Sequence, residues 1–507
     1  MTSRISSKRK SAGARRTHIP PNSGEASFIK CFSTQKAIRY LTDEELAEVN
    51  KKNYPVDKFC DLARAFDCMD YKILFTGSVE GEKLDLVIFG ASGFTGKYTT
   101  EEALRLSKVN DGFTWGIAGR SSKKLKHILD DISKKTGEDL SHIPIIEADL
   151  QNFDSLLHMA SRARVVVNCV GPYRFYGEPV VKACIESGAH QVDVTGEIQY
   201  IQKLMLSYNT LAEEKGVFII NACGFDCIPT DMGVVFLQNK FEGDINSVEA
   251  YLEIDVDVKD RKGPAIHFGT WESAIHVTSH YGEIQSLQRK LFPDRLPRLT
   301  PKLKQRLLPH RRSDVEGWCL PFPGTDIAVA ESSQRHFYKN EMKRPVQFNM
   351  YFVLPSLLTT IGFIFRALLV GLLAQCRLGV KFLLKHPGMF TSGYVTHEDP
   401  AEEILKNTLF RFTLFAEGWK ERLPEPTPKN VMPINKKVTV QIKGRNPAYG
   451  ATCTALVLSA VTIIKEREKM PARGGVITTA TAFSKTSLIK ELHKEGLTFD
   501  VISVEEN

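Results

Sequence analysis

A glycine-rich turn between a strand-like run and a helix-like run constrains this chain more than any other feature of its sequence. The stretch LDLVIFGASGFTGKYTTEEALRL covers residues 84–106 and contains Gly90, Gly93 and Gly96. Glycines at such positions allow a tight turn, close approach of a diphosphate to the main chain, and close packing of helix on strand. The N-terminus of the following helix adds N–H groups and a positive dipole end. The turn therefore predicts a binding site for NAD or NADP.

The same letters also resemble a phosphate-loop NTPase motif, A-S-G-F-T-G-K. That motif needs Ser or Thr directly after the lysine, because the hydroxyl binds Mg²⁺. Here Tyr98 follows Lys97. The next hydroxyl, on Thr99, lies about 100° further around the helix. The NTPase interpretation therefore fails at the residue that the chemistry requires.

Apolar runs of strand length alternate with helical stretches around the turn, which is typical of a parallel sheet. Six such runs follow one another: LDLVIFG, FTWGIAG, HIPIIEADL, ARVVVNCVG, HQVDVTG and GVFIINACG. We expect an α/β fold with a doubly wound Rossmann domain over residues 83–230. A second α/β domain is expected over residues 231–345 and 390–507, with C-terminal helices that return to the Rossmann domain. The Pro-rich, basic stretch over residues 285–312 is expected to be an irregular loop.

The end of the second predicted strand distinguishes the two cofactors. An NAD enzyme usually ends this strand with Asp or Glu, which binds the ribose 2′-hydroxyl. Here the sequence AGRSSKK presents Arg120 and two lysines instead. Because a guanidinium can pair with a 2′-phosphate, we expect NADP(H), with NAD(H) as the alternative. No metal is expected, since Cys223 and Cys227 lack a histidine pair at ligand spacing.

The N-terminal extension and the cysteines bear on where the protein is located in the cell. Residues 1–82 are expected to be a partly disordered extension, and a mitochondrial transit peptide is the alternative for its basic start. The ten cysteines show no paired spacing, which indicates a reducing compartment.

A hydrophobic segment over residues 346–389 separates the two parts of the second domain. Its apolar centre, residues 351–376, is long enough to cross a bilayer of about 30 Å as a helix. Arg366 near the middle would cost roughly 2.5–3.5 kcal/mol, and Pro355 interrupts the run. Basic residues flank both ends, so we expect the segment to dip into a membrane or lipid monolayer, or to lie on it. A buried helical hairpin is the alternative.

Seven ordered motifs closely resemble the saccharopine dehydrogenase-like oxidoreductases of animals. They are VIFGASGFTG, AGRSSKKL, VVVNCVGPYRFYGEPVVKAC, VDVTGE, GFDCIPTDMG, GTWESAI and GGVITTATAFSKTSLI. The chain is also similar, more distantly, to mycobacterial trans-acting enoyl reductases and to true saccharopine reductases. The resemblance implies a cofactor cleft between the two domains and a location at lipid droplets or mitochondria. It supplies no substrate.

The resemblance also assigns residues to the cofactor site. The expected diphosphate turn consists of Gly90, Ser92, Gly93, Phe94, Thr95 and Gly96, with Arg120 for the 2′-phosphate. Asp149 ends the third strand, where related folds touch the adenine, and a helix-capping role is its alternative. Asn168, Gly171 and Pro172 follow the fourth strand, where the chain would approach the nicotinamide ribose.

A proton donor or acceptor is needed beside the substrate when a hydride is transferred. The Tyr-x-x-x-Lys pair of short-chain dehydrogenases does not follow the glycine turn. The candidates are therefore Tyr173, Tyr176, Glu197 and Asp226. Each of them also has an ordinary interpretation in capping, turn hydrogen bonds or domain packing.

Two functions stay open at this point. The first is an NADP(H)-dependent oxidoreductase in lipid or glycolipid metabolism, which acts on a hydrophobic or lipid-linked carbonyl or enoyl substrate at a droplet or membrane surface. The second is a catalytically silent NADP-binding scaffold on lipid droplets, and a true saccharopine reductase is a further alternative. Nucleic-acid binding is not expected, because the basic runs lack interleaved aromatic residues. A homodimer is compatible with the sequence.

Overall fold

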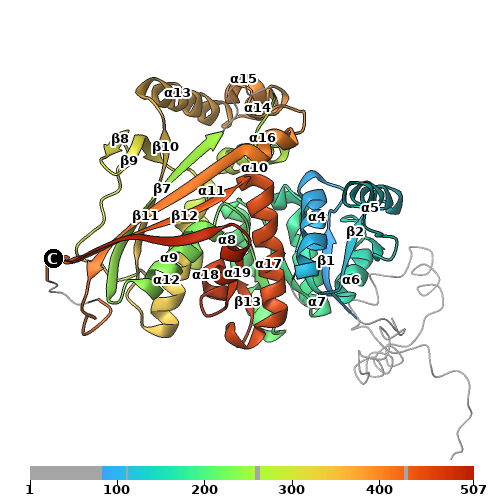
Figure 1. Cartoon of the computed structure of the whole chain (residues 1–507), viewed down its shortest axis with the longest axis horizontal. Helices are drawn as coiled ribbons and strands as arrows, with labels where there is room; N and C mark the ends of the chain where they lie inside the picture. The colour runs from blue at the N-terminus through green and yellow to red at the C-terminus, as the bar shows by residue number, and fades with distance from the viewer. Residues whose placement is uncertain (1–82, 110–111, 257–262, 428–431, 507) are drawn as a thin grey trace, which may run out of the picture. The chain divides into compact units, whose positions relative to one another are not determined.

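The computed structural model describes residues 83–109, 112–256, 263–427 and 432–506, which all belong to one compact unit (Figure 1). This unit contains two seven-stranded sheets with helices packed against them. The predicted α/β class is confirmed. The predictions for the extension over residues 1–82 lie outside the described residues.

The first sheet is fully parallel and follows the order β13-β6-β5-β4-β1-β2-β3. Its strands are β1 (Leu84–Phe89), β2 (Trp115–Gly119), β3 (Ile145–Glu147), β4 (Ala163–Asn168), β5 (His190–Asp193), β6 (Phe218–Ile220) and β13 (Gly475–Ile477). The helices that connect or follow the first six strands are α4 (Phe94–Val109), α5 (Ser122–Thr136), α6 (Phe153–Ser161), α7 (Tyr173–Ser187), α8 (Ile198–Glu214) and α9 (Ile228–Lys240). The order of these six strands is that of a doubly wound dinucleotide fold.

Both faces of this sheet are buried, as parallel sheets require. On β1, Leu86 and Ile88 pack into the apolar cluster shared with α4 and α5, whereas Val87 and Phe89 pack into the cluster shared with α6, α7 and α8. The C-terminal part of the chain completes the sheet, because β13 pairs with β6. Helix α17 (Thr452–Lys465) packs on α4 and on the central strands.

The second sheet is mixed and follows the order β14-β12-β11-β7-β10-β9-β8. Its strands are β7 (Asp244–Val256), β8 (His310–Arg312), β9 (Val315–Pro321), β10 (Gln347–Leu354), β11 (Thr408–Trp419), β12 (Lys436–Arg445) and β14 (Thr498–Glu506). Strand β7 is parallel to β10, and the other neighbours are antiparallel. Helices α9 and α12 (Asp326–Glu341) pack on this sheet, and one apolar cluster contains residues of both sheets.

The remaining helices correct two predictions. They are α10 (Phe268–Ser279), α11 (Gly282–Leu291), α13 (Leu357–Leu373), α14 (Arg377–Lys385), α15 (Pro387–Thr391), α16 (Glu402–Asn407), α18 (Thr479–Phe483), α19 (Leu488–Lys494), the π-helical turn Pro447–Ala451 and the 3₁₀ turn Arg467–Lys469. Residues 285–291 are helical and residues 310–312 form β8, so the predicted irregular loop over residues 285–312 is confined to the segment between α11 and β8. Residues 351–354 belong to β10, so the apolar run 351–376 is not one helix.

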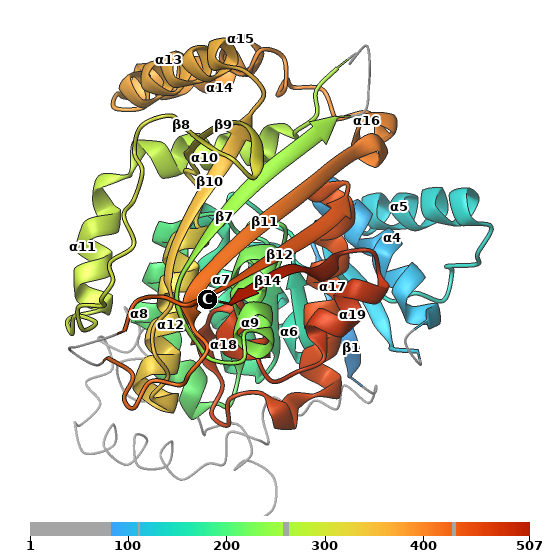
Figure 2. The ribbon, with the colours of Figure 1, turned by 60° about the vertical axis from the view of Figure 1, so that its left-hand side comes forward.

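Helices α13, α14 and α15 form a group beyond one end of the second sheet (Figures 1 and 2). Helix α13 begins at a capping box, in which the Ser356 hydroxyl accepts the Thr359 N–H and the Thr359 hydroxyl accepts the Ser356 N–H. This local signal separates the helix from β10 and so divides the long apolar run into a strand and a helix.

Candidate functional site

The turn after β1 and the loop after β4 meet at the carboxyl edge of the first sheet. The strand order reverses between these two neighbours, and that point is where doubly wound folds bind ligands. The Gly90 N–H donates to the Ala118 carbonyl over 2.9 Å, and the Cys169 N–H donates to the Phe89 carbonyl over 2.9 Å. The three strand ends are thereby tied together around one crevice.

Two of the predicted glycines are required by this geometry. Gly90 has a φ of +87°, and a Cβ there would lie 2.6 Å from a Val170 methyl group. A Cβ on Gly96 would lie 2.1 Å from the Gly90 carbonyl oxygen, so any side chain would push α4 away from the turn. Ser92 and Gly93 are exposed at the rim. The turn is therefore a cradle that a side chain would fill, which is what a bound diphosphate needs.

The start of α4 offers unpaired donors to such a group. The Lys97 N–H donates to the Gly93 carbonyl over 2.9 Å. The N–H groups of Phe94, Thr95 and Gly96 lie in the first helical turn, where a helix has no carbonyl to offer them. That first turn also carries no acidic residue. These residues fit the diphosphate of a dinucleotide cofactor.

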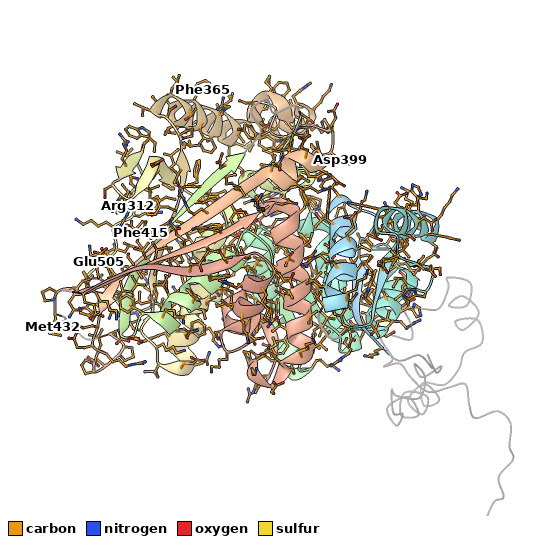
Figure 3. All side chains as sticks on the ribbon, in the orientation of Figure 1. Arg312, Phe365, Asp399, Phe415, Met432 and Glu505 are labelled. Carbon is orange, nitrogen blue, oxygen red and sulfur yellow. The ribbon has the colours of Figure 1, made fainter. Side chains whose placement is uncertain are left out.

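An aromatic group that the sequence did not reveal supports the side of the turn. The Phe94 ring stacks on His267 with centroids 4.7 Å apart, and it meets the Tyr449 ring edge-on at 4.6 Å. The His267 Nε2 atom lies 3.4 Å from Asp399 Oδ1, and Asp399 is labelled in Figure 3. Two segments far apart in the sequence thus hold the helix start in place.

Arg120 lies at the end of the second strand, where the sequence predicted it. It directly follows β2 and is exposed. The next residue, Ser121, caps α5 by accepting the Lys124 N–H. Arg120 is therefore left at the strand end, with its guanidinium available to a 2′-phosphate. Its role in binding stays a prediction.

Asp149 does not cap a helix, so the alternative given for it is wrong. Asn152 is the N-cap of α6 and accepts the Ser155 N–H. The Asp149 Oδ1 atom instead accepts the Gln151 N–H over 3.0 Å and shapes the turn after β3. Its predicted contact with the adenine stays a prediction.

The loop after β4 contains a buried donor without a partner. Asn168 is fully buried, and its Oδ1 atom accepts the Val170 N–H over 3.0 Å. Its Nδ2 atom has no hydrogen-bond partner among the described residues. Because buried polar groups are normally satisfied, this amide fits a loop that binds a ligand, and Gly171 and Pro172 continue it.

Two catalytic candidates are fully engaged in holding this loop. The Tyr173 hydroxyl donates to the Asn168 carbonyl over 2.9 Å, and burial raises the pKa of Tyr173 well above its usual range. The Glu197 carboxylate accepts the N–H groups of Tyr173 and Arg174, each over 2.8 Å, and the Ser273 hydroxyl over 2.9 Å. This geometry makes Tyr173 and Glu197 positioning residues, and it opposes the prediction that either transfers a proton.

The other two candidates stay available. Tyr176 is 42% exposed. Asp226 is exposed, and its Oδ2 atom lies 2.7 Å from the position that a Cβ on Gly196 would take. The residue as a whole is exposed, but its carboxyl group is buried, and this burial raises the pKa of Asp226. A carboxyl with a raised pKa holds its proton nearer to neutral pH, which suits a general acid.

Sequence reasoning missed a third acid at this edge. Glu272 lies on α10 and is half-buried, and both burial and the charge of Glu197 raise its pKa. It belongs to the motif GTWESAI, but nothing in the spacing of that motif indicates a role. Only the packing of α10 against Glu197 through Ser273 reveals it.

A buried polar network beneath the site was also missed. The Asp193 carboxylate accepts the N–H groups of Thr195 and Ala222 and the side-chain amide of Asn221, at 3.1, 3.2 and 2.7 Å. Burial raises the pKa of Asp193 to about 6. The network joins the ends of β5 and β6, so it fixes the floor on which the loops rest.

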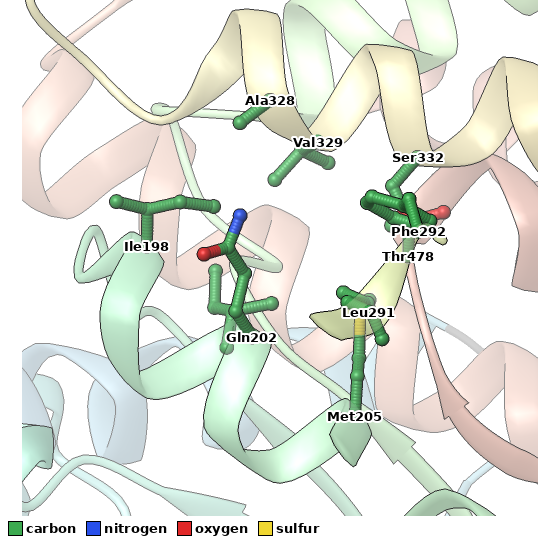
Figure 4. A pocket seen from close by; sticks show the side chains of 10 residues that line it. Ile198, Gln202, Met205, Leu291, Phe292, Ala328, Val329, Ser332 and Thr478 are labelled. Atoms are coloured by element: carbon green, nitrogen blue, oxygen red, sulfur yellow. The ribbon is translucent and has the colours of Figure 1, made fainter. Parts of the chain in front are cut away.

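A small cavity beside α8 and α12 is not a substrate pocket (Figure 4). Ile198 and Gln202 face Val329 across it, and Met205 and Leu291 close one end. Its volume of about 10 Å³ admits a single water molecule at most.

Comparison with known proteins identifies the family. Residues 86–220 match the model of the saccharopine dehydrogenase NADP binding domain. A saccharopine dehydrogenase-like oxidoreductase of Homo sapiens is 38% identical over 434 residues, which cover 85% of this chain and 100% of the relative. The chain belongs to the saccharopine dehydrogenase-like oxidoreductases. It is thus a member of an oxidoreductase family and carries that family's NADP-binding domain.

Other members of the family differ in their stated locations. A relative from Caenorhabditis elegans named lipid droplet localized protein is 34% identical, over 83% of this chain and 99% of the relative. A relative from Arabidopsis thaliana, whose name gives mitochondria as its expected location, is 29% identical, over 83% of this chain and 96% of the relative. The expected distant likeness to a mycobacterial trans-acting enoyl reductase is found as well, over 45% of the chain.

This family member carries an apolar surface at α13 and α14 that none of the described residues covers. We call it the apolar face. Its exposed side chains are Leu358, Ile361, Phe365, Leu368, Leu372 and Leu378, with exposed fractions of 80, 55, 68, 69, 72 and 79%. The opposite side of α13 packs on α10 and α14 through Leu369, Val370 and Leu373. The alternative of a buried hairpin is therefore wrong, and Figure 3 shows Phe365 on this surface.

Proposed function

We propose that this chain is an NADP(H)-dependent reductase that acts on an uncharged, hydrophobic carbonyl or enoyl substrate at a lipid surface. One observation carries the proposal: helix α10 contacts both the helices that carry the apolar face, on their buried side, and the carboxyl edge of the first sheet. The Trp271 Nε1–H donates to the Leu383 carbonyl of α14 over 3.1 Å. Two residues further along, the Ser273 hydroxyl donates to Glu197.

The position of α10 supports a substrate that enters from lipid. Ile275 lies in the apolar cluster of α13, α14 and α15, whereas Glu272 faces the charge of Glu197. A molecule that leaves a lipid layer beside α10 therefore needs to travel only the length of one twelve-residue helix to reach the cofactor edge. Lipid droplets and mitochondria, the locations in the names of two relatives, both offer such a layer.

The charges at this edge oppose a true saccharopine reductase. Saccharopine carries several carboxylates, which need cationic partners. The acids Glu197, Asp226 and Glu272 lie here, and each has a raised pKa. Arg174 is already paired with Glu283 at 2.7 Å. A neutral substrate avoids this repulsion.

The cofactor preference tests the first half of the proposal. NADPH and NADH are titrated into the purified chain and into Arg120→Ala, with calorimetric detection. Loss of a charge-assisted contact worth about 1.5–3 kcal/mol should weaken NADPH binding about 10- to 100-fold and leave NADH unchanged. Equal affinities of both cofactors for the unaltered chain would contradict the role of Arg120.

Turnover tests the second half. Vesicles that contain long-chain enals or ketones are incubated with the chain and NADPH, and the loss of NADPH absorbance is followed. Asp226→Asn, Glu272→Gln and Tyr176→Phe are the variants of interest, and Asp130→Asn, which alters an exposed acid on α5, is the matched control. The variant that removes the proton donor should lower kcat about 10²- to 10⁴-fold with an unchanged NADPH affinity.

The silent scaffold stays the second candidate, because Tyr173 and Glu197 are occupied in holding the loop. Tight NADPH binding without hydride transfer to any of these substrates would favour it. The expected homodimer stays a prediction.

A further inference from the structure

A second charged site lies at the amino edge of the first sheet, opposite the cofactor crevice. A cavity of about 180 Å³ there is lined by Lys83, Arg164, Gly188, His190, Ile463, Ile464 and Arg467. These residues lie at or beside the starts of β1, β4 and β5, at the C-cap of α7, at the end of α17 and in the following 3₁₀ turn, to which Arg467 belongs. The six residues of β1 separate the two edges by about 20 Å at 3.3 Å per residue.

Three cationic side chains line this basic cavity, and all of them lie close enough to His190 to lower its pKa. Lys83, Arg164 and Arg467 all line it, and burial, together with their positive charges, lowers the pKa of His190 to about 4. Among the described residues, no acid lines the cavity. Like charges that converge on one cavity repel one another unless an anion lies between them.

His190 adds a neutral donor. Its Nδ1 atom accepts the Phe218 N–H over 3.0 Å, so the proton of the neutral ring is on Nε2. The ring lines the cavity. A neutral N–H beside three cations matches an oxyanion, which accepts hydrogen bonds from charged and uncharged donors alike.

The cations are only partly explained by contacts within the protein. Arg467 donates to the Pro471 and Ala472 carbonyls and lies 4.3 Å above the Phe218 ring, so it is held in place. One nitrogen of Arg164 pairs with Asp85 at 2.8 Å. The cations are also not needed to satisfy the carbonyl groups at the C-terminus of α7. The N–H of Gly188, the C-cap residue, already donates to the Cys184 and Ile185 carbonyls there.

We propose that this basic cavity binds a phosphate monoester group. Three cations less the charge of Asp85 leave an excess of about two, which matches a dianion. The volume is below the roughly 300 Å³ at which pockets accept drug-sized ligands, so only the phosphate end of a molecule enters. That group belongs either to a soluble phosphorylated metabolite or to the headgroup of a phospholipid.

The test uses the full chain saturated with NADPH, so that the cofactor crevice is occupied. Glycerol 3-phosphate is titrated by calorimetry at low salt into the unaltered chain and into Lys83→Gln/Arg164→Gln. Both altered side chains are partly or fully exposed. The matched control is Lys126→Gln/Lys134→Gln, which changes the charge equally on the exposed side of α5. Unfolding midpoints of all three proteins are compared first.

The expected result is at least a tenfold weaker affinity in the cavity variant and no change in the control. Vesicles with phosphatidic acid or with phosphatidylcholine alone form the second arm, in the background Phe365→Ser/Leu368→Ser, which weakens binding through the apolar face. Dependence on Lys83 and Arg164 only with phosphatidic acid identifies a lipid headgroup, and dependence with glycerol 3-phosphate identifies a soluble ligand.

The proposal is overturned if the cavity variant and the control bind both probes with equal affinity, or if neither probe binds the unaltered chain. Should the double variant be unstable, Lys83→Gln alone decides the question, because this side chain is exposed and lies outside the strands. The same two outcomes then apply to the single variant.

Discussion

Helices α17 and α13 are both apolar, yet the fold places them in opposite surroundings. Within the described residues, the one helix with the length and composition to cross a membrane is the continuous stretch Pro447–Lys465, and 78% of its apolar window is buried inside the protein. In α13, by contrast, Thr360 alone is fully buried. A helix that is hydrophobic on all sides needs a partner on all sides. The sheet and α4 supply it for α17, whereas the outer side of α13 has none among the described residues.

The difference shows that hydropathy identifies an apolar helix but not what covers it. Residues 452–463 touch strands that lie more than two hundred residues earlier in the chain. Helix α13, which carries the apolar face, lies beyond one end of the second sheet instead (Figure 2). Lipid is the partner that we propose for it.

The largest effect is expected from matched leucine truncations in the two helices. Leu456 in α17 is fully buried, whereas Leu368 in α13 is 69% exposed. Leu456→Ala should lower the free energy of unfolding by about 2–5 kcal/mol, and Leu368→Ala should change it by less than about 0.5 kcal/mol. Urea unfolding measures both. Equal losses would mean that α13 is covered in solution, which would break the comparison.

The second effect concerns vesicle binding by the apolar face. Phe365→Ser/Leu368→Ser removes two side chains that are 68 and 69% exposed. Because burial of each such side chain is worth about 1.5–3 kcal/mol, the loss of both should weaken partition onto vesicles at least about 100-fold. The control Leu307→Ser/Leu308→Ser alters a similarly exposed pair in another segment. Similar losses in both variants would show that α13 is not the binding surface.

The third effect is the pH dependence of stability that the buried carboxyl of Asp193 causes. Burial raises the pKa of Asp193 from 3.8 to about 6. A carboxyl with a raised folded-state pKa costs stability once it ionises, so this cost is absent below about pH 4 and complete above about pH 6. The stability of the unaltered chain relative to Asp193→Asn should therefore fall by about 3 kcal/mol between those limits. Urea unfolding at several pH values checks this, and parallel pH curves would refute it.

The smallest effect comes from the basic residues beside the apolar face. Lys381 lies on α14 and is exposed. A lysine near an anionic lipid surface contributes about 1 kcal/mol, so Lys381→Gln should bind anionic vesicles about fivefold more weakly. Neutral vesicles should bind equally well, and high salt should abolish the difference. Sensitivity on neutral vesicles would point to a packing role instead.

Local sterics explain why the cofactor turn was predictable. Gly90 and Gly96 leave no room for a side chain, and the six apolar runs have the length and spacing of buried parallel strands. Both the turn and the strands can therefore be recognised from a few consecutive residues of sequence. The family match over residues 86–220 confirms the NADP-binding domain that these signals predicted.

Long-range packing explains what was missed. Strand β13 has three residues and gains its identity only by pairing with β6. Tyr173 and Glu197 were placed near the right loop, but their roles depend on which way each side chain points. Glu272 was missed because α10 reaches the cofactor edge only through tertiary contacts with Glu197 and Leu383.

The pairing of β13 with β6 has a consequence for biosynthesis. When the ribosome has made the first 230 residues, six strands of the first sheet exist, but β6 has a bare edge and the groove for α17 is open. Bare edges and exposed apolar grooves favour aggregation. The cofactor-binding half, although its strands are mostly synthesised first, is therefore completed only near the end of synthesis, and the nascent chain needs shielding until residues 447–477 emerge and close it.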